Sequence, residues 1–284
     1  MAVCVAGMHR SGTSLLTKLL HLSGLYLGQE QDLLAANSGN PEGHWEHEQI
    51  LEINEELLAE FGGGWDYPPD LSGLRDRRRV ARLEQRARVV LAQFAESEIW
   101  GWKDPRNSLT LPFWRPLVGR LHVVVCVRNP LEVALSLRRR NGSTIAFGLA
   151  LWSAYNEALM RTTVAEERIV THYARYLADP VAESARVGGR VGLALSDEHA
   201  EQLRQSTKTD LRHSRFSLAD LVAVNVSTHV IDQYRSLCAE ADSPDETMSS
   251  ELSVAAGETR HGSAGDDVVG RFDYAAMQRL LRLA

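Results

Sequence analysis

The segment AVCVAGMHRSGTS, residues 2–14, joins a short apolar run to a loop that contains two glycines. Leucines then recur at helical spacing from Leu15 to Leu22, and Gly24 follows as a suitable helix stop. An apolar run, a glycine-containing loop and an amphipathic helix in this order predict a β-strand that turns sharply into a helix.

The loop from Gly7 to Ser14 can be compared with the nucleotide-binding loop G-x-x-x-x-G-K-[ST], in which backbone N–H groups surround phosphates and a lysine reaches the terminal one. Here Thr13 stands where that motif has lysine, and the basic residue is Arg10, inside the loop. A loop that leads into a helix N-terminus favours anions because free N–H groups and the helix dipole point at it. The segment therefore predicts an anion-binding loop.

Further strand patterns alternate with helical patterns along the chain. Alternation of this kind is typical of a parallel β-sheet covered by helices on both faces. The sequence thus predicts an α/β fold with three layers, α/β/α, around a central parallel sheet. The predicted strands after the first are Ile99–Trp102, Leu121–Val127 and Arg168–Tyr173, and the predicted helices are Trp45–Phe61, Leu74–Phe94, Pro130–Arg140 and Ile145–Thr163.

A second polar segment follows the strand predicted at Leu121–Val127. Arg128 comes directly after this strand, and the carboxyl ends of strands are where ligands bind in open α/β sheets. Asn129 can cap the next helix, and Pro130 suits its first position. Ser136 then falls inside this helix, eight positions after Arg128.

These two segments resemble the sulfotransferase superfamily. Arg-Ser-Gly-Thr at residues 10–13 looks like the loop that binds the 5'-phosphosulfate of 3'-phosphoadenosine 5'-phosphosulfate (PAPS), and members of the superfamily hold the 3'-phosphate with a strand-end arginine and a serine eight positions on. The resemblance implies a P-loop-type fold and a PAPS-dependent sulfotransferase. It also implies that PAPS, or its product 3'-phosphoadenosine 5'-phosphate (PAP), is bound by His9, Arg10, Ser11, Gly12, Thr13, Ser14, Arg128 and Ser136.

Residues 102–106, WKDPR, are similar to the Lys-Asp-Pro element of tyrosylprotein sulfotransferases, in which the lysine helps to stabilise the transferring group. A lysine directed at the bridging oxygen would offset the charge that develops as the sulfuryl group leaves. The resemblance therefore implies catalytic roles for Lys103 and for Arg10 of the loop.

Transfer to a hydroxyl also requires a group that accepts its proton. Residues 40–46, NPEGHWE, resemble the Asn-x-x-Gly-aromatic-Glu segment that follows the first helix in bacterial sulfotransferases. This resemblance implies Glu46 as the base, with Glu42 and His44 as alternatives. Glu46 has an alternative role of its own, because a carboxylate in the first turn of a helix stabilises that helix.

Two other functions fit part of the same pattern. A P-loop small-molecule or nucleotide kinase has this architecture, but it needs a loop lysine and a carboxylate for Mg²⁺, and Lys18 comes a full turn too late. A catalytically silent nucleotide-binding protein would keep the loop and lack the base. No metal site is predicted, because His44 and His47 have no third ligand at a suitable spacing.

The composition bounds the remaining properties. With 284 residues, 44% of them hydrophobic and 24% charged, the chain is expected to form one globular domain, 1–284. A formal net charge of −6 argues against nucleic acid as a partner. Three cysteines, the absence of an apolar stretch near ~20 residues and a functional loop close to Met1 predict a cytoplasmic protein without a membrane span. The partner is expected to be a small-molecule or glycan acceptor. Whether its hydroxyl belongs to a carbohydrate, a lipid, a phenol or a peptide is left open, as is the oligomeric state.

The C-terminal third is less informative. Asp210–Arg215 is a candidate substitute for the Arg-Lys-Gly element with which cytosolic family members contact the 3'-phosphate. Residues 242–270 are rich in Ser, Gly, Asp, Glu and Thr and lack apolar periodicity, which predicts a mobile loop or lid. Arg271–Leu283 returns to a helical pattern that is expected to dock on the domain.

Overall fold

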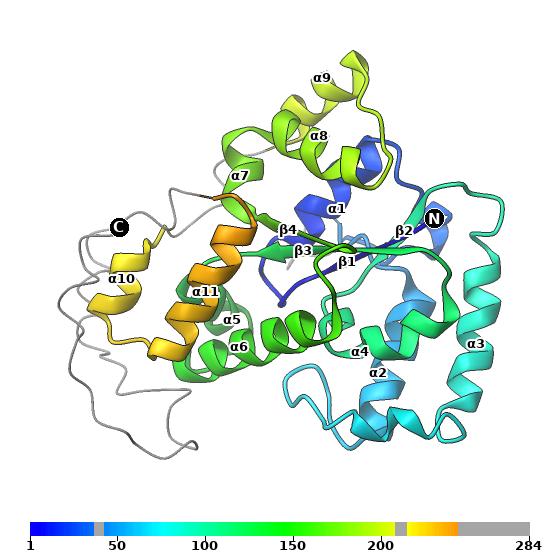
Figure 1. The fold of residues 1–284 in the computed structure, drawn as a ribbon, viewed down its shortest axis with the longest axis horizontal. Helices are drawn as coiled ribbons and strands as arrows, with labels where there is room; N and C mark the ends of the chain where they lie inside the picture. The colour runs from blue at the N-terminus through cyan, green and yellow to red at the C-terminus, as the bar shows by residue number, and fades with distance from the viewer. Residues whose placement is uncertain (37–42, 208–214, 244–284) are drawn as a thin grey trace.

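Residues 1–36, 43–207 and 215–243 are described by a computed structural model of the chain. Within these residues, parallel strands form one sheet in the order β2-β1-β3-β4 (Figure 1). Parallel neighbours require crossover connections, and helices provide them. The strands are β1 (Ala2–Ala6), β2 (Trp100–Lys103), β3 (Leu121–Val127) and β4 (Arg168–His172).

Helices connect the strands and follow the last one. Three short 3-10 helices, η1 (Glu30–Asp32), η2 (Ser72–Arg75) and η3 (Arg115–Leu117), lie in the connections. The α-helices are α1 (Thr13–Leu22), α2 (Glu48–Glu60), α3 (Ala81–Ala92), α4 (Asn107–Trp114), α5 (Pro130–Asn141), α6 (Ile145–Thr162), α7 (Tyr173–Ala178), α8 (Pro180–Arg190), α9 (Asp197–Ser206), α10 (Leu218–Ala223) and α11 (Thr228–Glu240).

Side chains of the strands alternate between two hydrophobic clusters, one on each face of the sheet. In β1, Val3 and Val5 belong to one cluster, whereas Cys4 and Ala6 belong to the other. Figure 1 shows α1, α8 and α9 on the first face and α2, α4, α5 and α6 on the opposite face. This arrangement confirms the predicted three-layer α/β/α fold with a central parallel sheet.

The register of the sheet brings the predicted polar segments to one edge. Val5 of β1 is paired with Lys103, which makes Lys103 the last residue of β2. The sequence pattern predicts that this strand ends one residue earlier, at Trp102. Ala6 of β1 is paired with Val125 of β3. The chain runs from β1 to β2 on one side and then to β3 on the other, which makes the carboxyl ends of β1 and β3 a topological switch point, where ligands bind in such sheets.

Two predicted helices begin later than the sequence pattern indicates. Trp45 has a left-handed backbone with φ 58°, which a helix does not contain, so α2 begins at Glu48. The helix predicted from Leu74 begins at Ala81, because η2 and a turn precede it.

Helix α4 is absent from the prediction. It carries Pro112 in its interior, a residue that usually ends helices, and it is buried on nearly every side, so no apolar period marks it. Tyr173, predicted as the last strand residue, instead begins α7, because the His172 side chain accepts a hydrogen bond from the Ala174 N–H and caps the helix.

The arginines of residues 75–88 are expected from the sequence to form a solvated helix face and not a substrate patch. In the structure several of them form exposed ion pairs with glutamates of α2. Exposed pairs contribute only about 0.2–1 kcal/mol each, but together they align α3 with α2. The pairs are Arg79–Glu60 at 3.2 Å, Arg82–Glu56 at 2.6 Å and Arg86–Glu52 at 3.3 Å.

Three regions of the sequence analysis fall outside the described residues. They are Glu42, all of Asp210–Arg215 except its last residue, and the segment 244–284, which holds most of the predicted lid and the predicted C-terminal helix. None of the described helices is both long enough and apolar enough to cross a membrane.

Candidate functional site

The loop between β1 and α1 is shaped by backbone conformations that side chains disfavour. Gly7 has φ 143°, and a Cβ atom there would lie 2.5 Å from the Cys126 carbonyl oxygen. Gly12 has φ 95°, and its Cβ atom would lie 2.2 Å from a ring carbon of Tyr173. Arg10 has φ 69° although it is not a glycine. Unfavourable backbone of this kind persists where the surrounding structure enforces it, and it is concentrated at functional sites.

The start of α1 has hydrogen-bonding capacity that the protein leaves unused. Gly12 is the N-cap and supplies no side-chain acceptor to the first N–H groups of the helix. The Ser11 hydroxyl is buried, and its oxygen has no hydrogen-bond partner in the part of the chain that the structure describes. Because buried polar groups are almost always hydrogen-bonded, the loop has the character of a phosphate or sulfate site.

Arg10 contacts both Ser136 of α5 and Arg128. Arg10 Nε donates to Ser136 Oγ at 2.8 Å, and Arg128 Nη1 donates to the Arg10 carbonyl oxygen at 3.1 Å. Glu132 pairs with Arg128 at 2.7 Å, and the Arg128 guanidinium lies 4.5 Å from the ring centroid of Tyr173. Burial, followed by neighbouring positive charges, lowers the pKa of Arg10. An anion beside this cluster would relieve that repulsion.

A buried ion pair stands on the other side of the loop. Lys103 Nζ, at the end of β2, donates to Glu46 Oε1 at 2.6 Å and to Ser14 Oγ at 3.2 Å. The Lys103 and Glu46 side chains are 1% and 9% exposed. Ser14 in turn donates to the carbonyl oxygen of His44 at 3.3 Å. The structure therefore brings together the predicted base, the predicted catalytic lysine and the last residue of the anion loop.

Asn54 of α2 fixes the loop that follows Lys103. Its Nδ2 donates to Asp104 Oδ2 at 2.9 Å and to Asn107 Oδ1 at 3.1 Å. Its Oδ1 accepts from Thr110 Oγ1 and Trp114 Nε1, both at 2.8 Å. Asn54 is fully buried, and these bonds use its complete donor and acceptor capacity. The helix that follows Glu46 is thereby joined to the segment that follows Lys103.

Asp104, the residue after Lys103, has a structural role in this network. Its Oδ1 accepts from the Arg106 backbone N–H at 2.9 Å and from Arg106 Nη1 at 3.0 Å. Burial raises the pKa of Asp104, while the Arg106 charge opposes that change. The carboxylate of Asp104 thus shapes the turn that follows Lys103.

The two histidines nearest the site remain neutral near pH 7. Burial, with the positive charges around it, lowers the pKa of His9 well below its ordinary value. Burial also lowers the pKa of His44, although Glu46 acts in the opposite direction. A neutral imidazole can accept a proton, so His44 retains the capacity for base catalysis that the sequence suggests.

A family model described as the sulfotransferase family matches residues 2–197. The chain belongs to this family. The match spans β1 to β4 and the residues of the candidate site, from the anion loop to Tyr173, and it ends at the start of α9. None of the curated proteins compared with this sulfotransferase matches it.

Solved structures similar to this sulfotransferase have low identity and TM-scores below 0.5, so the assignment rests on the family model. The sulfotransferase domain of the olefin synthase from Synechococcus PCC 7002 is 18% identical, with a TM-score of 0.47 over 85% of this chain and 93% of that one. A sulfotransferase from Mycobacterium avium is 13% identical, with a TM-score of 0.48 over 84% and 74%. A retinol dehydratase in complex with androsterone and inactive cofactor PAP is 19% identical, with a TM-score of 0.40 over 72% and 63%.

Sequence reasoning identified the cationic residues of this sulfotransferase but missed their partners. Glu132 pairs with Arg128 at a spacing of i, i+4, which is a signal that the sequence contains. Asn54 and Tyr173 carry no such signal, because their contacts are distant in sequence. In the described ranges no cluster of three or more metal-ligating side chains occurs.

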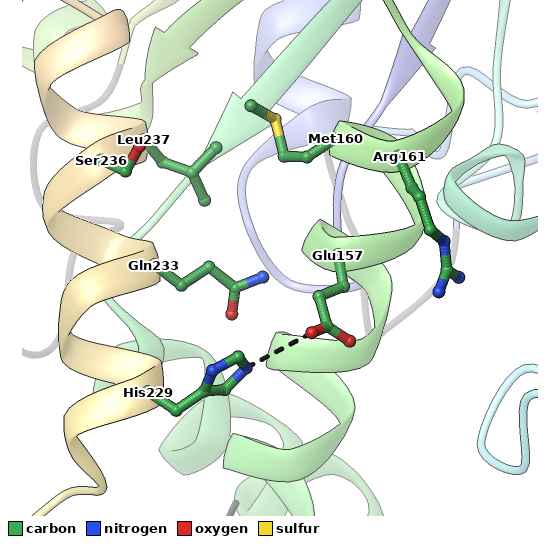
Figure 2. Close-up of a pocket in the computed structure, with 7 residues that line it drawn as sticks. All are labelled: Glu157, Met160, Arg161, His229, Gln233, Ser236 and Leu237. Atoms are coloured by element: carbon green, nitrogen blue, oxygen red, sulfur yellow. Dashed lines mark ion pairs between the residues drawn. The ribbon is translucent and has the colours of Figure 1, made fainter.

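A pocket lies between α6 and α11 (Figure 2). It has a volume of about 410 Å³, and a His229–Glu157 ion pair of 3.4 Å spans it. Met160 and Leu237 give it an apolar wall on one side. None of the residues that line it belongs to the candidate site.

Proposed function

We propose that this sulfotransferase transfers a sulfuryl group from PAPS to a hydroxyl group. The observation that carries the proposal is the convergence of three features at the carboxyl edge of β1, β2 and β3. These are the anion loop, the Arg10–Arg128–Ser136 cluster on one side of it and the Lys103–Glu46 pair on the other.

The residues of the site suit a ligand with two separate anionic groups. The N–H groups at the start of α1, with Ser11, Thr13 and Ser14, would hold the 5'-phosphosulfate. Arg128 and Ser136 would hold the 3'-phosphate. Arg10 belongs to the anion loop and is hydrogen-bonded to both Ser136 and Arg128, so it links the two groups of residues. When bound, PAPS supplies a sulfuryl group on a good leaving phosphate. The buried, unpartnered Ser11 hydroxyl is consistent with this fit.

Glu46 would act on the acceptor hydroxyl, and Lys103 would act on the phosphate oxygen that leaves. As the oxygen of the acceptor forms its bond to sulfur, Glu46 accepts the proton of that hydroxyl. As the bond from sulfur to the phosphate oxygen breaks, Lys103 offsets the negative charge that develops on that oxygen. The products are the sulfated acceptor and PAP, and the proton leaves from Glu46 to solvent.

Calorimetry with PAP distinguishes this proposal from a kinase. We expect PAP to bind without added magnesium, and much more tightly than ADP, because Arg10, Arg128 and Ser136 supply the contacts to a 3'-phosphate directly. Equal affinity for ADP, or binding that disappears in EDTA, would support the kinase alternative.

A turnover assay distinguishes an active enzyme from a silent nucleotide-binding protein. Cells that express the chain, and matched cells that express the Lys103→Ala variant, are compared by mass spectrometry for metabolites that gain the mass of one SO₃ group. A gain that requires Lys103 supports the proposal, and identical profiles contradict it.

A further inference from the structure

Arg140, in the last turn of α5, differs from three of the other cations around the site. Its guanidinium lies 5.2 Å from the ring centroid of Trp65, and its Nε donates to the neutral Asn141 Oδ1 at 2.5 Å. It is exposed, and no carboxylate within residues 1–36, 43–207 and 215–243 pairs with it. The neighbouring cations do have such partners: Arg128 pairs with Glu132, Lys103 with Glu46, and Arg106 with Asp104 and Glu55.

His9 lies against the same tryptophan and has an unused nitrogen. The ring centroids of His9 and Trp65 are 4.8 Å apart, and those of His9 and Tyr155 are 5.8 Å apart. The Tyr155 hydroxyl donates to the Trp65 carbonyl oxygen at 2.5 Å, which fixes the aromatic wall. His9 is 8% exposed, and its buried Nε2 has no hydrogen-bond partner among the residues that the structure covers. A buried, unpartnered nitrogen in a native protein indicates a missing partner.

The field at this position is positive. After burial, the charges that lower the pKa of His9 are, in order, those of Arg106, Arg140, Lys103 and Arg10. Four cations therefore act on one neutral imidazole. Because Lys103 and Arg106 are paired with carboxylates, the attraction for an anion at this position comes mainly from Arg140.

Arg140 also interacts electrostatically with the proposed base, Glu46. Partial burial of the guanidinium, followed by the charge of Arg106, lowers the pKa of Arg140, and the negative charge of Glu46 opposes this effect. The two side chains therefore act on the same region of the site.

From this arrangement, and resting on the proposed function, we propose that the acceptor is a small organic anion. Its carboxylate, sulfate or phosphate group binds to Arg140 beside Trp65, and its hydroxyl group faces Glu46. Arginine suits this role because its planar fork matches two oxygens of such a group. His9 supplies a neutral hydrogen bond to the same molecule.

The test uses simple anions as probes of the PAP-saturated protein. The protein is first saturated with PAP, whose affinity is measured by calorimetry. Sodium sulfate and sodium acetate are then titrated separately at constant ionic strength against sodium chloride, and the melting temperature is recorded. The variants are Arg140→Gln and, as a matched control, Arg138→Gln, which removes an equal charge from the same helical turn.

We expect sulfate to stabilise the wild type and Arg138→Gln equally, and to bind Arg140→Gln at least about tenfold more weakly, which is the loss typical of a charged hydrogen bond. Stabilisation by sulfate alone indicates an acceptor with a tetrahedral dianion, and stabilisation by acetate as well indicates a carboxylate. Equal responses in all three proteins, or none, would overturn the inference.

Affinity for PAP separates this inference from the proposed function. If Arg140→Gln weakens PAP itself by a similar factor, Arg140 belongs to the cofactor site and the acceptor assignment is wrong. If PAP fails to bind even the wild type, the proposed function fails, whatever the anion titration gives.

Discussion

Replacing Glu46 by glutamine tests the centre of the proposed mechanism. The Glu46 and Lys103 side chains are 9% and 1% exposed and 2.6 Å apart. Removal of one partner from a buried ion pair costs about 3–5 kcal/mol, because the other charge stays buried without compensation. Glutamine keeps the size and an acceptor oxygen, and Ser14 still accepts from Lys103, so we expect the lower limit, about 3 kcal/mol. The melting temperature should fall by roughly 6–12 °C, at about 2–4 °C per kcal/mol for a chain of this size.

Urea unfolding of single and double variants measures this loss. The double variant Glu46→Gln/Lys103→Met should be more stable than the sum of the single losses predicts, with a coupling energy of about 0.5–3 kcal/mol. Glu48→Gln is the matched control, since Glu48 is an exposed carboxylate in the first turn of α2, and its loss should cost less than about 1 kcal/mol. A loss for Glu46→Gln no larger than that of the control would refute the ion pair.

Turnover gives the second measurement on the same variant. If Glu46 is the base, its replacement should lower turnover by about 10² to 10⁴ while PAP still binds. If more than about a tenth of the wild-type rate remains under conditions where chemistry is rate-limiting, His44 is the next residue to replace.

Three further predictions concern the cofactor loop and its surroundings. Arg128→Ala should weaken PAP at least about tenfold in calorimetry, because charged hydrogen bonds contribute about 1.5–3 kcal/mol, and unchanged affinity would remove Arg128 from the site. Gly12→Ala should abolish PAP binding and lower the melting temperature, because φ is 95° and the new methyl group would meet Tyr173, whereas Gly189→Ala, with nothing near the added methyl group, should do neither. Stability should decrease as the pH falls below about 6.5, because the unfolded chain protonates its histidines while folded His9, whose pKa is lowered, stays neutral. Urea unfolding at a series of pH values should show that the His9→Gln variant loses less stability on acidification than the wild type, by up to about 1.4 kcal/mol per pH unit. Parallel curves of stability against pH for the two proteins would count against a buried neutral His9.

The predictable part of this molecule consists of features that are local in sequence. The β1–loop–α1 unit follows from apolar runs and glycines within residues 2–22, and the structure confirms it. The Asn129 cap and Pro130 at the start of α5 are also confirmed, because capping depends on adjacent residues. These short-range rules place Arg128 at the correct edge of the sheet.

The unpredicted part depends on contacts between distant residues. Glu46 and Lys103 are far apart in the chain, and only the sheet register and the packing of α2 bring them together. The pattern that identified each as catalytic contains no information that they pair. That a single domain includes residues 244–284 stays a prediction, as does the lid.

The hydrogen bonds of Asn54 have a consequence for protein engineering. Because Asn54 joins α2 to the segment that follows Lys103, residues 44–70 and 104–114 form one exchangeable unit and not two. A chimaera that imports only the first segment from a relative without this asparagine would leave the indole N–H of Trp114 buried without its acceptor, whereas Thr110 would keep its bond to the Arg106 carbonyl oxygen. Transplants intended to alter the choice of acceptor should therefore carry both segments together.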